Sequence, residues 1–162
     1  MPGHVIGTKL PLGYAGAPSQ MSDCQIKSYL FPVDTKTAGK TIEFGTAVVF
    51  DAAIGGVRPV AAGDTAAMLV GVAVRHYGDP HNDTPNGWFY QPGDTVGVLV
   101  RGSIVVPTAD STVAARGAVY VKAADGTVTA TAGSNLALAG AKFESGRVEG
   151  GLVEITVLTR NA

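Results

Sequence analysis

The side chains with the greatest potential for chemistry lie close together in one polar segment. Two imidazoles and two carboxylates stand within eight residues, at His76, Asp79, His81 and Asp83. Histidine nitrogen and carboxylate oxygen are common ligands of zinc and other transition metals. The spacing matches no metal-binding signature, however, and residues 77–91 contain Asp-Pro, Thr-Pro and Asn-Gly pairs that are typical of consecutive turns. We therefore interpret these side chains as part of a solvated loop and expect no metal and no cofactor.

The other candidates for catalysis have structural explanations. Cys24 is the single cysteine and has no flanking motif, and no serine lies in a nucleophile-elbow pattern. Asp64, Asp94 and Asp125 each stand beside a glycine, as turns require. The chain also lacks a phosphate-binding loop and a dinucleotide fingerprint. We therefore expect that the protein is not an enzyme.

Composition and charge limit the possible partners. The 162 residues carry a net charge of −1 and form no basic cluster, which argues against nucleic acid or an anionic membrane as a partner. No run of eighteen apolar residues occurs, and the N-terminus lacks the pattern of a signal peptide. The length favours one domain, and 22 glycines and 9 prolines favour strands and turns over helices.

A central strand is predicted at residues 92–107. Apolar residues of one parity in this stretch indicate a strand with one face in a core, and Gly102 is the expected position of a bend. Arg101 and Ser103 fall on the opposite face. The residues of the apolar parity are Val96, Val98, Val100, Ile104 and Val106.

Shorter strands surround this central one. Residues 66–76 repeat its pattern, an apolar run broken by one glycine and closed by an arginine, here Arg75, so we expect the two strands to be neighbours. Asp125-Gly126 predicts a hairpin, residues 41–51 and 57–60 predict another, and residues 133–140 are expected to be a loop. The fold class is all-β with little helix, a compact β-barrel or β-sandwich of about eight or nine short strands. The shorter strands are expected at 25–33, 41–51, 57–60, 66–76, 117–123, 127–131, 141–144 and 152–159.

The N-terminal segment differs from the rest of the chain. Residues 1–23, which we call the arm, contain three prolines and four glycines, so neither a helical nor a strand period persists. The arm is either a floppy terminus or an extended element that becomes ordered on a partner. Residues 24–162 are expected to form a single β-domain. The arm side chains expected to contact a partner are Val5, Ile6, Lys9, Leu10, Leu12 and Tyr14.

Several blocks of sequence occur together in a fixed order. They are the opening MPGHVIGTKLPLGYAGAP, the middle VGVAVR, then PGDTVGVLVRGSIVV followed by GAVYV, and the closing VEITVLTRN. Together they resemble structural cement proteins, the capsid decoration proteins of tailed bacteriophages. The resemblance spans nearly the full length, although the polar loop at 77–91 has no match.

The resemblance implies a non-enzymatic protein of the virion, made in the host cytoplasm. Such a protein binds the outer surface of the mature head and braces neighbouring subunits of the major capsid protein. It also implies a homo-oligomer, for which we favour a trimer over a dimer. The residues expected at the oligomer interface are Arg75, Arg101 and Ser103. For the two arginines, a structural or interface ion pair is a more natural role than substrate binding.

Two other functions stay open at this stage. A phage tail or surface β-domain that binds carbohydrate or another protein is the alternative, because exposed rings at Trp88, Phe89 and Tyr90 could stack on sugars. An enzyme would require His76, His81 and a carboxylate to converge on a metal or in a pocket.

Overall fold

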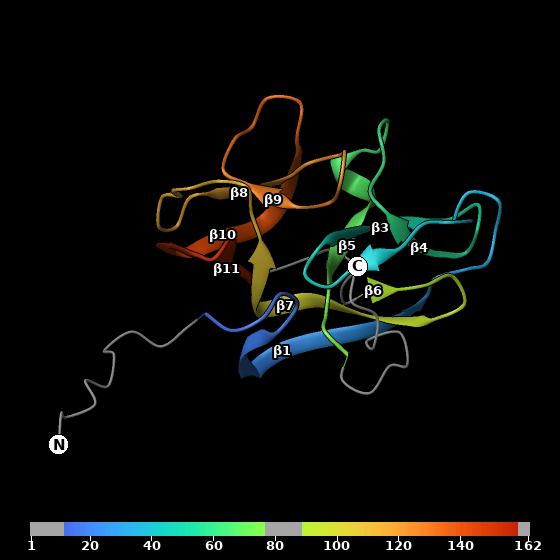
Figure 1. The fold of residues 1–162 in the computed structure, drawn as a ribbon, viewed down its shortest axis with the longest axis horizontal. Coiled ribbons are helices and arrows are strands. Elements are labelled where there is room, and N and C mark those ends of the chain that lie inside the picture. The colour runs from blue at the N-terminus through green and yellow to red at the C-terminus, as the bar shows by residue number, and fades with distance from the viewer. Residues whose placement is uncertain (1–11, 77–88, 159–162) are drawn as a thin grey trace, which may run out of the picture.

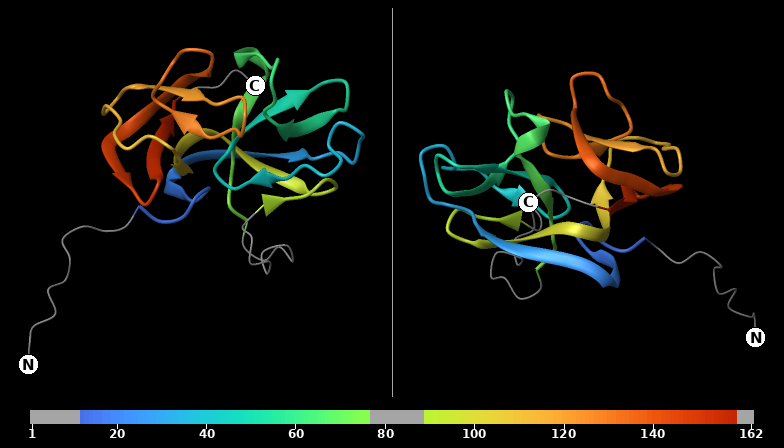
Figure 2. Two further views of the ribbon diagram at one scale, coloured as in Figure 1. Left: turned by 45° about the horizontal axis from the view of Figure 1, so that its top comes forward. Right: turned by 180° about the vertical axis from the view of Figure 1, so that it is seen from behind.

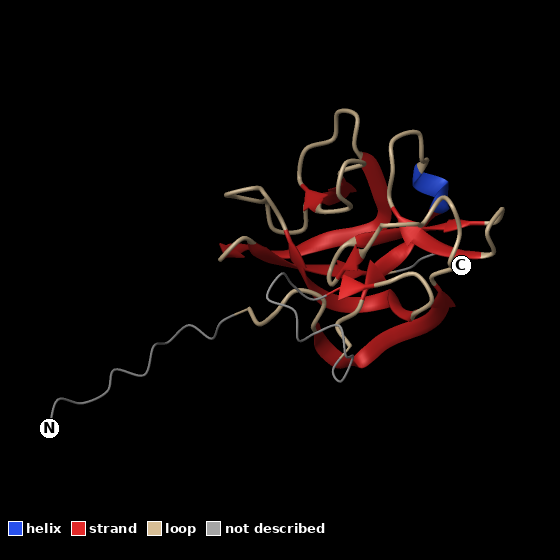
Figure 3. Ribbon diagram, turned by 45° about the vertical axis from the view of Figure 1, so that its right-hand side comes forward, coloured by secondary structure: helices blue, strands red, loops and turns tan. Residues whose placement is uncertain are grey.

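The computed structural model describes residues 12–76 and 89–158, and nearly all of their regular structure is β-strand (Figure 1). The helical element of these residues is one short 3₁₀ turn at Ala66–Met68, the blue turn in Figure 3. The strands are β1 (Pro18–Leu30), β2 (Ile42–Glu43), β3 (Ala47–Asp51), β4 (Gly56–Pro59), β5 (Leu69–Ala73), β6 (Phe89–Tyr90), β7 (Thr95–Pro107), β8 (Ala118–Val121), β9 (Val128–Thr129), β10 (Leu136–Glu149) and β11 (Leu152–Val157).

The strands form one long curled sheet and a small second sheet. The long sheet has the order β4-β3-β5-β7-β11-β10-β8-β9, with β1 added as a branch on β7, and β2 pairs with β6. This arrangement confirms the expected compact all-β fold with little helix. No helix among the described residues has the length and apolar character needed to cross a membrane.

Strand β7 has the central position predicted from its alternation. Along one edge it pairs with β1, and along the other it pairs first with β5 and then with β11 (Figure 2). The change of partner occurs at Gly102, whose φ of 117° lies in the region that glycine adopts most easily. A Cβ at Gly102 would lie 2.8 Å from the sulfur of Cys24, so the close approach of β1 also requires glycine there. The predicted bend at Gly102 is therefore confirmed.

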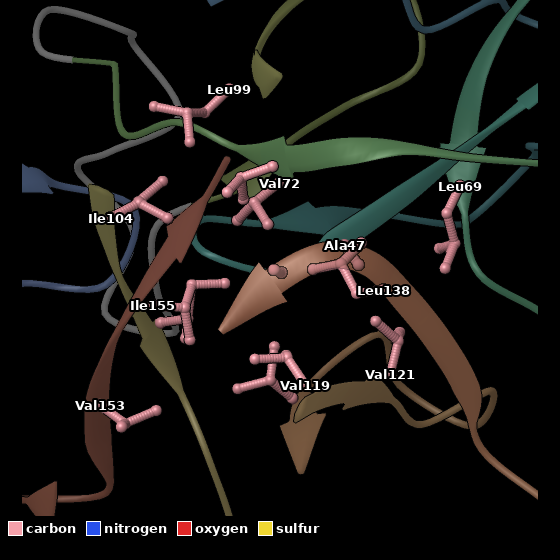
Figure 4. Packing of buried hydrophobic residues seen from close by; sticks show 14 of the residues in the cluster. Ala47, Leu69, Val72, Leu99, Ile104, Val119, Val121, Leu138, Val153 and Ile155 are labelled. Carbon is pink, nitrogen blue, oxygen red and sulfur yellow. The ribbon is translucent and has the colours of Figure 1, made fainter. Parts of the chain in front are cut away.

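The apolar side chains of β7 that share one parity pack into two different hydrophobic clusters. Their shared parity predicts a single core face. Val96, Val98 and Val100 pack with Phe31 and Tyr90, among others, in a cluster on one side of the sheet. Ile104 and Val106 join the larger cluster formed by side chains from β3, β5, β8, β10 and β11 (Figure 4). The positive φ at Gly102 interrupts the alternation, so residues of one parity face different cores before and after it.

Local turn signals identify the hairpins correctly. Strands β3 and β4 form an antiparallel hairpin, as do β8 and β9, and the Asp125 carboxylate between β8 and β9 accepts a hydrogen bond from the backbone N–H of Thr127 at 2.9 Å. Strand β5 pairs with β7 as expected.

The predicted loop at 133–140 is wrong over most of its length, and the strand predicted at 141–144 is too short. Most of the expected loop at 133–140 and the short strand at 141–144 belong to the 14-residue strand β10. Gly140 has a φ of 75° and breaks the period of two in its middle. Leu138 on one side of this break and Phe143 on the other are both buried, which is why the strand continues through it.

A buried ion network holds the β3–β4 hairpin to the loop that follows it. Arg58, 9% exposed, donates from Nε to Asp51 at 3.0 Å and from its two terminal nitrogens to Asp64 at 2.9 and 2.6 Å. The hydrogen bond to Asp64 is the main reason that the pKa of Arg58 is raised. The hydrogen bond from Arg58 is likewise the main reason that the pKa of Asp51 is lowered.

Asp64 belongs to the same network, although its neighbour Gly63 suggests only a turn residue. Burial acts to raise the pKa of Asp64, but hydrogen bonds from Arg58 and from the backbone N–H of Ala61, at 2.7 Å, outweigh burial and lower it. The carboxylate is therefore a structural partner of Arg58.

Candidate partner-binding surface

Two of the arm residues expected to contact a partner lie in the described part of the chain. Leu12 is half-buried, and Tyr14 is 66% exposed. The other expected arm contacts, Val5, Ile6, Lys9 and Leu10, lie outside the described residues. Strand β1 begins at Pro18, so the expected boundary between arm and domain at residue 23 falls inside a strand that pairs with β7.

The base of the arm is fixed to the β-domain by backbone hydrogen bonds. Gly16 donates its N–H to the carbonyl of Val105 at 2.8 Å, and its own carbonyl accepts the N–H of Arg75 at 2.8 Å. The N–H of Val105 in turn donates to the carbonyl of Ala17 at 3.0 Å. The chain is therefore attached to β7 and to the end of β5 before β1 begins.

Two glycines permit this close approach. Gly16 has a φ of 76°, and a Cβ there would lie 2.8 Å from the backbone nitrogen of Arg75 and 2.9 Å from Cβ of Phe44. Gly45 has a φ of 81°, and its Cβ would lie 2.9 Å from the nitrogen of Gly16. A side chain at either position would clash with these atoms, so the close approach of the arm requires glycine at both.

Two of the predicted site residues meet at this base. The guanidinium carbon of Arg75 lies 4.9 Å from the ring centroid of Tyr14 and 5.8 Å from that of Phe44. Phe44 packs edge-on against Tyr90, with ring centroids 5.1 Å apart. We call the pair formed by Tyr14 and Arg75 the Tyr14–Arg75 stack. From sequence, Tyr14 is expected at the capsid contact and Arg75 at the oligomer interface, so their meeting is unexpected. No local sequence signal marks Gly16, Phe44 or Gly45 as part of this site.

Arg101 and Ser103 have partners within the chain. The Arg101 guanidinium lies 3.2 Å from the carboxylate of Asp23, and both side chains are more than half exposed. Ser103 is 6% exposed, and its hydroxyl shares a hydrogen bond of 2.8 Å with Thr156, which donates to Glu144 at 2.5 Å. Their expected place at an oligomer interface stays a prediction.

The described part of the chain contains no cluster of three histidine, cysteine or acidic side chains that could hold a metal. His76 is exposed, whereas Asp79, His81 and Asp83 lie outside the described residues. Cys24 is half-buried and packs against the larger core cluster. An open groove between the loops at 39–43, 59–62 and 123–125 is lined mainly by small side chains, and neither histidine nor cysteine lines it.

The rings proposed to stack on sugar are only partly described. Tyr90 is 2% exposed, and its hydroxyl donates to the carbonyl of Val74 at 2.6 Å, so it is a core residue. Phe89 is half-buried, and Trp88 lies outside the described residues. A sugar site built on Tyr90 is thereby excluded.

Comparison with known proteins identifies first the fold and then the family. The chain is similar to a chain in a solved structure titled "The capsid of Myoviridae Phage XM1", with a TM-score of 0.69, 18% sequence identity and 96% of each chain covered. A family profile described as structural cement protein (E217 gp24/Pam3 gp6) matches residues 3–158. The chain therefore belongs to the structural cement protein family. A search of curated proteins finds no match.

Family membership confirms the function expected from the resemblance. The protein is a bacteriophage structural protein that decorates and stabilises the capsid. Membership also implies a location in the virion, binding to capsid proteins and a role other than catalysis.

Proposed function

We propose that the protein binds the outer surface of the mature head and braces neighbouring subunits of the major capsid protein, using the arm as part of its binding surface. The family match over residues 3–158 carries this proposal, because it includes nearly all of the arm. The fixed base at Gly16 supports it as well, since the chain beyond that point starts from a defined place on the domain.

The proposed arrangement suits a protein that acts in many copies. A decoration protein that touches several capsid subunits at once gains effective concentration for its second and third contacts, so each contact can be weak. An extended arm adds contact area and becomes ordered on its partner, which makes its affinity depend on the state of that partner. Binding that differs between capsid states follows from this dependence.

Self-association belongs to the proposal, and we favour a trimer. Among the described strands, β1 pairs with β7 alone, so a 13-residue strand lies at a sheet edge. Its side chains Ile26 and Leu30 are 42% and 52% exposed. Edges of this kind are commonly covered by sister copies in symmetric oligomers.

Co-sedimentation with two forms of the capsid tests the proposal. Expanded heads that lack the protein should retain it in the pellet, whereas unexpanded procapsids should retain much less. Equal binding to both would contradict a protein that recognises the mature head.

Deletion of residues 1–11 tests the role of the arm. The truncated protein should keep its melting temperature and bind expanded heads at least tenfold more weakly, about 1.4 kcal/mol. Deletion of residues 1–23 is a less clean test, because it also removes the first residues of β1 and their pairing with β7. Unchanged binding after the shorter deletion would refute the role of the arm.

A further inference from the structure

Tyr14 combines an exposed ring with a fixed backbone. Its carbonyl accepts the N–H of Ala17 at 3.0 Å, and glycines in the left-handed region stand on both sides of it, Gly13 with a φ of 103° and Gly16 with a φ of 76°. No atom lies within 4 Å of the position that a Cβ would take at Gly13. The chain therefore has open space at Gly13 and is fixed at Gly16, and Tyr14 stands between the two.

The guanidinium of Arg75 stacks on the ring of Tyr14, and the peptide unit that joins Val74 to Arg75 is held by two hydrogen bonds. Its N–H donates to the carbonyl of Gly16, and the carbonyl of the preceding residue, Val74, accepts the hydroxyl of the buried Tyr90. The same guanidinium of Arg75 also lies over the ring of Phe44, and that ring packs edge-on against Tyr90. The Tyr14–Arg75 stack thus continues into the smaller hydrophobic cluster.

Packing inside the domain does not require a ring at position 14. Tyr14 is 66% exposed and buries little apolar area, so its removal leaves the clusters around β7 intact. The contact of its ring with Arg75 does, however, restrict the orientation of Tyr14, from which the chain continues toward the N-terminus. A binding segment whose starting direction is already restricted loses less conformational entropy on binding than a segment that is free to point anywhere.

We propose that Tyr14 and Arg75 are positioning residues: their stack sets the direction in which the arm leaves the β-domain and so raises the affinity of the arm for the major capsid protein. This inference rests on the proposed function, because it requires residues 1–11 to contribute to binding. This positioning role differs from a direct contact with the capsid, because the stack would act through residues 1–11.

The test measures the affinity of purified variants for expanded heads. Tyr14→Ala and Arg75→Ala should each weaken binding about fivefold, close to 1 kcal/mol. Tyr14→Phe should bind within about twofold of the natural protein, because the face of the ring remains. Phe50→Ala is the matched control, since Phe50 is another partly exposed ring, 6.2 Å from the ring of Tyr29, and it should not affect binding. Melting temperatures identify any variant whose domain is damaged.

Combination with the deletion of residues 1–11 separates positioning from direct contact. If Tyr14 acts through the arm, Tyr14→Ala should have no further effect in the truncated protein. A further loss there would show that Tyr14 itself touches the capsid and would overturn the inference. If the truncated protein binds weakly but Tyr14→Ala binds normally, the positioning role of the stack is refuted and the role of the arm is not. Normal binding of the truncated protein would instead overturn the proposed role of the arm.

Discussion

Arg58 and Arg75 are both held close to the protein core, yet their surroundings differ. Arg58 lies between the carboxylates of Asp51 and Asp64 inside the β3–β4 region. Arg75 lies between the rings of Tyr14 and Phe44 where the arm joins the domain. Carboxylates neutralise a buried cation and hold one hairpin together, whereas aromatic faces support a cation beside an exposed residue. We therefore expect substitutions around Arg58 to lower stability and substitutions around Arg75, under the proposed role of the Tyr14–Arg75 stack, to lower binding.

The largest effect is expected from Arg58→Ala. Removal of this cation leaves Asp51 and Asp64 without their shared partner, and we expect a loss of about 3 kcal/mol in the free energy of unfolding. The affinity of the remaining folded protein for heads should be unchanged. Denaturant unfolding and co-sedimentation measure the two quantities. Arg147→Ala is the control, because the Arg147–Glu149 pair is partly exposed and its loss should cost less than about 1 kcal/mol.

Gly16→Ala should affect both stability and binding. Its Cβ would lie 2.8 Å from backbone nitrogen at a positive φ, so we expect a loss of about 2 kcal/mol or displacement of the arm base from β7. Gly39→Ala provides the comparison. Gly39 has a φ of 68° but open space around it, so only the cost of the backbone conformation, about 1 kcal/mol, applies there. Equal losses for both variants would show that the close contact at Gly16 contributes nothing.

A smaller effect is expected from acid. The pKa values of Asp51 and Asp64 are lowered in the folded protein, so the unfolded chain binds more protons in acid. The stabilisation from these groups should be complete above their ordinary pKa of about 3.8 and should be lost as the pH falls through the lower folded values. Melting temperatures below pH 4 should fall more steeply for the natural protein than for Asp64→Asn. Parallel curves would show that the Asp64 carboxylate does not contribute to the loss of stability in acid.

The parts of the fold that could be predicted from sequence are those with local signals. The alternating valines of β7 and the Asp125-Gly126 turn identify their elements because the period and the turn chemistry need no distant partner. Strand β10 is missed because Gly140 interrupts its period, and β1 is poorly recognised because register shifts occur opposite β7 and much of its surface is exposed. A search for unbroken alternation of apolar and polar residues does not find strands of this kind.

The candidate site depends on contacts between distant parts of the chain. Tyr14 and Arg75 are both predicted as contact residues, but nothing in their local sequence places one upon the other. The contact between Tyr14 and Arg75 depends on two tertiary features. Gly16 and Gly45 must lie in contact, and β5 must pair with β7. The Arg58 network could not be predicted either, because Gly63-Asp64 has the composition of an ordinary turn.

The proposed function requires the protein to bind the outer surface of the capsid, with the arm reaching a capsid subunit. Reconstructions of expanded heads with and without the added protein test it most directly. We expect added density on the outer surface at junctions between major capsid protein subunits, with the chain running from Tyr14 onto a capsid subunit. Added density on the inner surface, or a bound domain whose arm points away from every capsid subunit, would contradict it.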